Sequence, residues 1–255
     1  MRGELCVGFA TVLSFASLLC LIFMHVGQIS TSSVPRHIYM AKVNVSLYGA
    51  GLEARLGDPI GGLYTSNASA PLQASAGLRQ FYEFGLYSYC GYVDAVNGTC
   101  TNSTTARRYE PFDALTADMI ANYTQITEAI IKGTSFQDDN YQASTSKAAY
   151  YLLLLGTICA GLAFLTGVIK HTVAFLFSAF ISIVGSILLL AGSALWTVML
   201  KKSQDINNID VGDTDSVPFG ITVDVGQGIF LMWAGLACLV VSIIPYMISC
   251  CTYRG

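Results

Sequence analysis

The sequence predicts an all-α bundle of four transmembrane helices with a β-rich extracellular module in its first loop. Four long runs contain no Lys, Arg, Asp or Glu. Each is long enough to cross ~30 Å of hydrocarbon as a helix. Hydrophobic residues make up 53% of the chain and charged residues 11%, whereas soluble domains carry about 25% charged residues. The one long hydrophilic stretch lies between the first and second runs, so the sequence leaves little material for a cytosolic domain.

The apolar runs divide the chain into eight expected segments. These are a cytosolic amino end with the first span (1–29), a glycosylated extracellular module (30–147), the second span (148–168), a cytosolic loop (169–172), the third span (173–200), an acidic extracellular loop (201–225), the fourth span (226–251) and a short cytosolic tail (252–255). The first run is longer than the 7–15 residues of a signal-peptide core, and no A-x-A-like site follows it. We therefore expect it to be retained as a helix.

The orientation rests on the sequons and cysteines of the first loop. Lys and Arg near the span ends are almost balanced: Arg2, Lys170 and Arg254 on one face, and Arg36, Lys147, Lys201 and Lys202 on the other. That count leans slightly against cytosolic termini. However, all five N-x-Ser/Thr sequons lie in the first loop, at Asn44, Asn67, Asn97, Asn102 and Asn122. Glycosylation and disulfides both need the lumenal or extracellular side, so we expect a plasma-membrane protein with both termini cytosolic.

The module carries patterns for two strands and one helix. Residues 38–47 alternate between apolar and polar side chains, which is typical of a half-buried strand. Residues 64–78 are small and polar, so we expect a flexible connection. Residues 79–90 are rich in Phe and Tyr and predict a second strand. Apolar side chains recur every three or four residues over 113–132, which predicts an amphipathic helix, and Gly133 lies where a C-cap glycine would.

Cys90 and Cys100 are the cysteines of this module. Nine residues separate them, and the intervening Asn97-Gly98 favours a tight turn. In an oxidising compartment we expect a disulfide, which would contribute about 3 kcal/mol on the chain-entropy estimate. Two free thiols are the alternative.

Small residues recur along the later spans at helical spacing. Helices associate in lipid through close packing at such residues. The candidate packing residues are Ser178, Ser182 and Ser186 in the third span, and Ala234, Cys238 and Ser242 in the fourth. The second span offers Gly156 and Ala160. We expect these rows to close a tight left-handed bundle; a lateral oligomer seam is the alternative.

No pattern predicts catalysis, a metal site or a cofactor. The three histidines, His25, His37 and His171, are isolated in the sequence. The acidic loop with Asp205, Asp210, Asp213 and Asp215 lacks the EF-hand register. A net charge of −3 gives no basic surface for nucleic acid. Cys6, Cys250 and Cys251 lie at span ends that we expect to be cytosolic, where they are candidates for S-palmitoylation; filling the membrane interface is the alternative.

The phrase Gly85-Leu86-Tyr87, followed by Cys90 and Cys100, resembles the claudin signature, with Tyr87 where claudins carry Trp. The first loop is about twice the claudin length. The chain is more similar to the fungal cortical-patch (eisosome-associated) tetraspan and PalI family. That resemblance covers residues 81–90, the aromatic-acidic stretch 109–113, and Gly226, Trp233 and the terminal cysteine pair of the last span. Members carry long cytosolic tails, whereas this chain stops at Gly255, so roles that depend on the tail are not expected.

The resemblance implies a non-enzymatic organiser of the fungal plasma membrane, linked to cell wall and cortex. Expected partners are the lipid bilayer, further copies or other membrane proteins, and cell-wall components. The alternative is a claudin-like pore or a calcium-influx accessory subunit. The acidic loop favours that alternative, but the absence of charge within the spans counts against an ion route. A tetraspanin would place its large loop between the third and fourth spans, and this chain does not.

Overall fold

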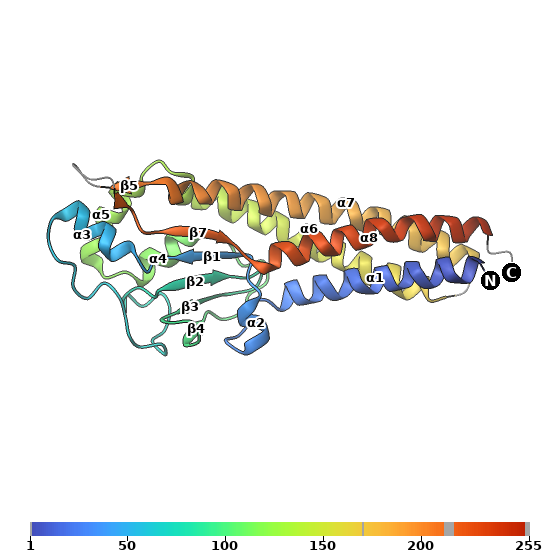
Figure 1. Cartoon of the computed structure of the whole chain (residues 1–255), viewed down its shortest axis with the longest axis horizontal. Helices are drawn as coiled ribbons and strands as arrows, with labels where there is room; N and C mark the ends of the chain where they lie inside the picture. Colours follow the sequence, from blue (N-terminus) through green and yellow to red (C-terminus); the bar gives the residue numbers. More distant parts are fainter. Residues whose placement is uncertain (1, 170, 212–216, 253–255) are drawn as a thin grey trace. The chain divides into compact units, whose positions relative to one another are not determined.

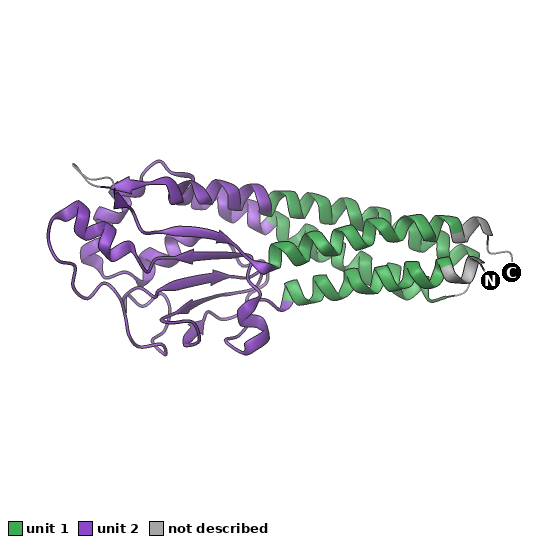
Figure 2. Cartoon of the chain, viewed as in Figure 1, with its two compact units in different colours: residues 1–25, 148–196, 228–255 green, residues 26–147, 197–227 purple. Residues whose placement is uncertain are grey.

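The computed structural model describes residues 2–169, 171–211 and 217–252 and divides the chain into two compact units (Figures 1 and 2). Unit 1 consists of residues 1–25, 148–196 and 228–255. Unit 2 consists of residues 26–147 and 197–227. Unit 2 therefore draws on both of the stretches that were expected to be extracellular.

Unit 1 is built from four long helices. They are α1 (Arg2–Val26), α6 (Asp139–Gly167), α7 (Thr172–Ser203) and α8 (Gln227–Thr252). Each contains a segment long and apolar enough to cross a membrane, which confirms the predicted four-span class. Unit 2 includes residues 139–147 of α6 and 197–203 of α7. Helix α6 begins nine residues before the expected span at 148, with Asp139 in its first turn, and α7 ends with Lys201 and Lys202 in its last turn. Lys201 and Lys202 suit the negative end of the helix dipole of α7.

Glycines let the helices of unit 1 approach closely. A Cβ at Gly156 of α6 would lie 2.6 Å from the Cγ of Leu189 on α7. A Cβ at Gly235 of α8 would lie 2.9 Å from the Cγ of Leu21 on α1. Separations below 3 Å cannot be accommodated without movement, so each glycine marks a contact that a larger residue would push apart.

Hydroxyl groups add hydrogen bonds between these helices. Ser17 donates to the carbonyl of Gly235 at 2.7 Å, and the hydroxyls of Ser14 and Tyr246 lie 3.1 Å apart. His25, expected to be isolated, lies 3.0 Å from the hydroxyl of Thr157. Such bonds are typically worth about 0.6 kcal/mol each in a membrane bundle.

The expected packing rows differ between the two spans. In α7, Ser178, Ser182 and Ser186 are all buried. In α8, Ser242 is buried, but Cys238 is half-buried and Ala234 is exposed. The expected row is wrong at Ala234, because the close contact runs one residue later, through Gly235 and the buried Leu239. Spacing by four defines a stripe, and the burial of the neighbouring residues decides which stripe faces the bundle.

Unit 2 is organised around a five-stranded antiparallel sheet with the order β4-β3-β2-β1-β7 (Figure 1). Its strands are β1 (Ala41–Asn44), β2 (Phe81–Phe84), β3 (Tyr89–Tyr92), β4 (Gly98–Cys100) and β7 (Thr222–Val225). The remaining elements are α2 (Ser33–His37), α3 (Tyr48–Leu56), α4 (Pro111–Asp118), α5 (Ala121–Ile131), η1 (Ser135–Gln137), η2 (Gln204–Asn208), β5 (Asp210–Val211) and β6 (Val217–Pro218).

The stretch 201–225, expected to be a separate acidic loop, contributes a strand to this sheet. β7 pairs with β1 in the register Val43 to Val223. Strand β7 has the sequence Thr-Val-Asp-Val, whose alternation suits a sheet with one buried face. The sequence predicted a module in the first loop and a separate second loop, whereas the structure has one sheet built from both stretches.

Two other expected elements are each divided in two. The single strand expected over 79–90 is the hairpin β2–β3, in which the Gly85 N–H donates to the Ser88 carbonyl at 2.9 Å. The helix expected over 113–132 breaks at Met119 and Ile120, whose backbones are extended. The apolar stripe continues across the break, which is why periodicity alone predicted one helix. Gly133 has the left-handed φ of 86° expected just after a helix end.

Two expected loops also differ in detail. The connection 64–78 is irregular, but backbone hydrogen bonds hold both of its ends. The Thr65 N–H donates to the Leu78 carbonyl at 2.9 Å, and the Leu78 N–H donates to the Leu63 carbonyl at 2.8 Å. The turn before β4 is centred on Asp94, whose carboxylate accepts from the N–H of Asn97 at 2.7 Å. Gly98 belongs to the strand rather than to the turn, so the Asn-Gly turn signal was misplaced.

We expect Gly156→Ala to destabilise the bundle. The added Cβ would collide with Leu189, and overpacking of this kind costs about 1–3 kcal/mol. Gly161→Ala on the same helix is the matched control. Its Cβ would lie 3.7 Å from Leu18, and Ala in place of Gly favours a helix by about 1 kcal/mol. Unfolding of the purified protein in detergent measures both variants, and equal stability of the two would contradict the packing described.

Candidate functional site

The signature residues lie on the β2–β3 hairpin of unit 2. Gly85 begins the turn, and a Cβ there would lie 2.5 Å from the carbonyl oxygen of Gly27. Leu86 is buried and Tyr87 is half-buried. Only glycine allows the chain segment after α1 to approach the hairpin this closely. Gly85 and Leu86 of the signature therefore serve packing within unit 2.

Gln28, the second residue after α1, fastens that segment to the sheet. Its side chain is fully buried and its φ is 57°. The side-chain amide donates to the Arg36 carbonyl at 2.7 Å and to Glu83 Oε2 at 3.1 Å. Gln28 Oε1 accepts from the Tyr92 hydroxyl at 3.1 Å, and the Gln28 carbonyl accepts from the Ser88 hydroxyl at 2.5 Å. These bonds offset the cost of a left-handed backbone at a non-glycine residue.

Cys90 and Cys100 form the expected disulfide, which joins β3 to β4. The two residues face each other directly in the strand register, with their Cα atoms 3.9 Å apart. The cross-link therefore holds the outermost strand of the sheet, β4, in place.

The half-exposed face of the sheet carries a charge pair among aromatic rings. Lys42 Nζ lies 3.1 Å from Glu83 Oε1 and 4.3 Å from the centre of the Phe81 ring. Burial raises the pKa of Glu83, while the nearby Lys42 and the amide of Gln28 oppose that rise. A hollow of about 230 Å³ lies beside this pair. Lys42 and Glu83 neutralise each other within unit 2, so we interpret the pair as structural.

A second polar network lies in the interior of unit 2. Arg79 Nη1 is 3.3 Å from Asp118 Oδ2, and both side chains are fully buried. The Tyr82 hydroxyl donates to the same oxygen at 2.8 Å, and the Gln73 N–H donates to Asp118 Oδ1 at 2.5 Å. Burial raises the pKa of Asp118, and these hydrogen bonds and Arg79 counter the rise. The network also fixes the end of α4, at the break that the sequence pattern did not reveal.

The aromatic-acidic stretch 109–113 packs against the sheet. The Tyr109 ring meets the Phe84 ring edge-on at 5.0 Å, and Phe84 stacks on Tyr89 at 5.1 Å. Pro111 begins α4, where its missing N–H is tolerated. This part of the family resemblance therefore also corresponds to packing.

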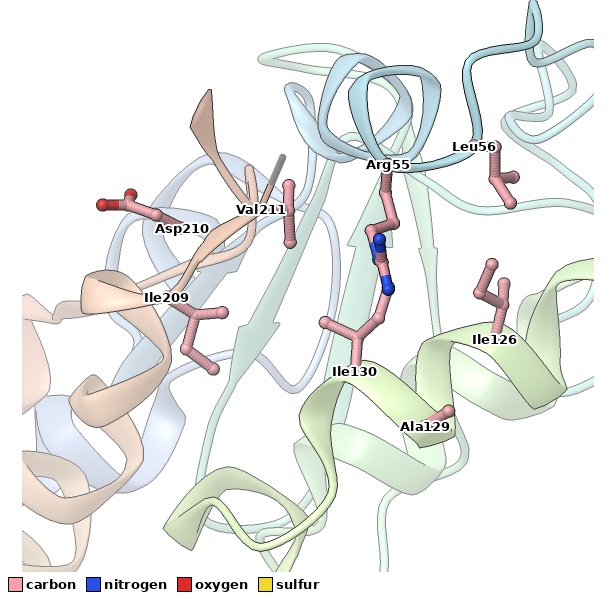
Figure 3. A pocket seen from close by; sticks show the side chains of 8 residues that line it. All are labelled: Arg55, Leu56, Ile126, Ala129, Ile130, Ile209, Asp210 and Val211. Atoms are coloured by element: carbon pink, nitrogen blue, oxygen red, sulfur yellow. The ribbon is translucent and has the colours of Figure 1, made fainter. Parts of the chain in front are cut away.

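A hollow of about 620 Å³ lies in unit 2 (Figure 3). Six apolar side chains and the charged Arg55 and Asp210 line it, from α3, from α5 and from the segment that contains β5. Its apolar members are Leu56, Ile126, Ala129, Ile130, Ile209 and Val211. Of the acidic loop, Asp210 is exposed beside this hollow and Asp205 is exposed on η2. Asp213 and Asp215 lie outside the described residues.

The sequons differ in accessibility. Asn67, Asn97, Asn102 and Asn122 are exposed, whereas Asn44 is half-buried in β1. Their glycosylation stays a prediction. Of the candidate palmitoylation sites, Cys6 is a half-buried free thiol, and the side chains of Cys250 and Cys251 lie outside the described residues.

Within the described residues, no group of three or more His, Cys, Asp or Glu is arranged to hold a metal ion. What unit 2 offers instead is a cross-linked sheet with internally paired charges. Patterns in the sequence did not single out Gln28, Arg79 or Asp118. Gln28 ends an apolar run, and Arg79 opens an aromatic strand; a polar residue in such a position is the signal that could have found them.

Comparison with known protein families gives a match over most of the chain. A family model described as the SUR7/PalI family matches residues 6–245. No curated protein matches the chain. The match extends from the first span through the sheet to the last span, so it covers both units, and the resemblance expected from the sequence is confirmed.

We expect Asp118→Ala to destabilise unit 2 strongly. The change leaves the buried Arg79 without its carboxylate, and removal of one partner of a buried pair costs about 3–5 kcal/mol. Asp113→Ala is the control, because Asp113 is exposed on the same helix. Thermal unfolding of the two purified variants tests this, and equal melting temperatures would show that the network does not hold the fold.

Proposed function

Because the chain belongs to the SUR7/PalI family, we propose that it is a non-enzymatic organiser of plasma-membrane domains, linking them to wall and cortex in a fungal cell. The family match over residues 6–245 carries this proposal. The structural support is that the signature motif and its surroundings are used for packing rather than chemistry. Such a protein acts through the surfaces that it presents.

We assign unit 2 to the outer side of the membrane and both termini to the cytosol. The disulfide of unit 2 needs an oxidising compartment. All five sequons also belong to unit 2, where glycosylation would occur on the same side. Contacts with cell-wall components would then be made by unit 2, and acylation at Cys6, Cys250 and Cys251 would anchor the cytosolic ends.

The mechanism that we propose is lateral association of the bundle in the bilayer. Helix α7 exposes a stripe of large apolar side chains: Val173, Leu176, Phe177, Phe180, Ile183, Ile187 and Leu190. Four spanning helices place this stripe in lipid, where it meets acyl chains or the helices of other proteins. Interior contacts such as Gly156 against Leu189 keep the stripe on one face.

A claudin-like pore or calcium-influx accessory subunit is the rival proposal. The exposed Asp205 and Asp210 are the described residues that favour it. The spans offer it no support, because an ion route through lipid normally carries charged side chains.

Imaging a tagged copy in fungal cells tests the organiser proposal. We expect patches at the plasma membrane, and we expect Ser182→Leu to disperse them, because Ser182 is fully buried in the bundle and a leucine there would force the helices apart. Val12→Leu, at an exposed position of α1 outside the stripe of α7, is the control and should leave the patches intact.

A uniform distribution of the unmodified protein would refute the organiser proposal. So would a selective cation current in planar bilayers that falls when Asp210 is neutralised, and that result would favour the pore.

A further inference from the structure

The sheet of unit 2 has two edge strands, β7 and β4, and the chain treats them differently. An open strand edge is a template for pairing with another chain, and natural proteins cover or block it. We infer that N-linked glycans on Asn97 and Asn102 cover the β4 edge and keep it from pairing with a second copy of this chain. This inference rests on the proposed outward placement of unit 2.

Side chains cap the β7 edge at Val223. The Gly226 N–H donates to the Met40 carbonyl. In an antiparallel pair, hydrogen-bonded and non-hydrogen-bonded residue pairs alternate, so this bond shows which residues of β7 bond to β1. It follows that the N–H and C=O of Val223 point away from β1. Asn207 meets both: its Oδ1 accepts from Val223 N–H at 2.6 Å, and its Nδ2 donates to the Val223 carbonyl at 3.1 Å. Gln204 donates to the same carbonyl at 3.1 Å.

The β4 edge has no comparable cap. The Thr101 N–H donates to the Tyr89 carbonyl, and the Val93 N–H donates to the Asn97 carbonyl. In the register of β3 and β4, the backbone N–H and C=O of Thr99 therefore point toward β3. Those of Gly98 and Cys100 point away from it. Among the described residues, no hydrogen bond reaches those outward groups. The strand itself, Gly-Thr-Cys, carries no charge or proline that would discourage pairing. The disulfide holds the strand in position, so its edge is preformed.

The two sequons bracket this strand. Asn97 immediately precedes β4, Asn102 lies two residues beyond it, and both are exposed. Asn97 Nδ2 donates to Asp94 Oδ2 at 2.9 Å; a glycosylated amide keeps one N–H, so this bond survives modification. Asn102 also lines a hollow of about 450 Å³ that includes Thr99, Cys100 and Thr101, which leaves room for sugar beside the strand.

Removal of these two glycans should therefore expose an edge that pairs with itself. The variant is Thr99→Ala with Thr104→Ala, which abolishes both sequons and leaves both asparagines in place. Thr99→Ser with Thr104→Ser keeps the sequons and is the matched control. Thr124→Ala removes the distant sequon at Asn122 on α5 and controls for the loss of a glycan elsewhere.

Two readouts decide the question in the full-length protein in detergent. Light scattering with size exclusion should show a larger assembly for the double alanine variant than for either control. Amide hydrogen exchange at Gly98 and Cys100 should slow on the order of tenfold in the associated form, because those N–H groups gain partners. Endoglycosidase treatment of the glycosylated protein without substitutions removes the glycans and leaves the sequence unchanged. It should give the same two results.

The outcomes separate the inference from the proposed function. Glycans on other sequons, but none on Asn97 and Asn102, would overturn the inference and leave the topology standing. An absence of glycans from all five sequons would overturn both. Association without protection of Gly98 and Cys100 would show that another surface pairs, and an unchanged size would show that the edge needs no cover.

Discussion

Strand β1 bonds to β2 on one side and to β7 on the other, and the sheet depends on this central position. β1 and β2 come from the stretch before α6, whereas β7 comes from the stretch between α7 and α8. The two stretches therefore cannot fold as independent loops, because β7 would lack a partner and β1 would be left as an edge. Gly226 shows how tight this junction is: a Cβ there would lie 1.9 Å from the Tyr39 carbonyl oxygen.

Buried polar groups keep the sheet in a single register. Gln28 joins the segment after α1 to Glu83 and Tyr92, and the Arg79–Asp118 pair joins the segment just before β2 to the end of α4. Each group is costly to bury without partners, so an alternative register that breaks these bonds is disfavoured. The signature residues also position chain segments, since Gly85 lets the segment after α1 approach the β2–β3 hairpin.

The sequence predicted what long patterns encode. Four spans follow from apolar runs, the disulfide from two cysteines in an oxidising compartment, and β1 from its alternation. Shorter elements were missed where the local signal was ambiguous. Thr222–Val225 alternates correctly, but it was concealed in an acidic stretch. The turn at Gly85 contains the buried Leu86, so it lacked the polar composition of a turn. The contacts of Gln28 and Asn207 depend on tertiary structure and have no local pattern at all.

An engineered cross-link between β1 and β7 tests most directly whether both stretches build one sheet. Val43 and Val223 face each other at a pair without mutual backbone hydrogen bonds, as Cys90 and Cys100 do. We predict that Val43→Cys with Val223→Cys forms a disulfide in the mature protein, detected by mass spectrometry after proteolysis. Val43→Cys with Val225→Cys, which is out of register, should not. Equal cross-linking of both pairs, or of neither, would show that β1 and β7 do not pair in this register.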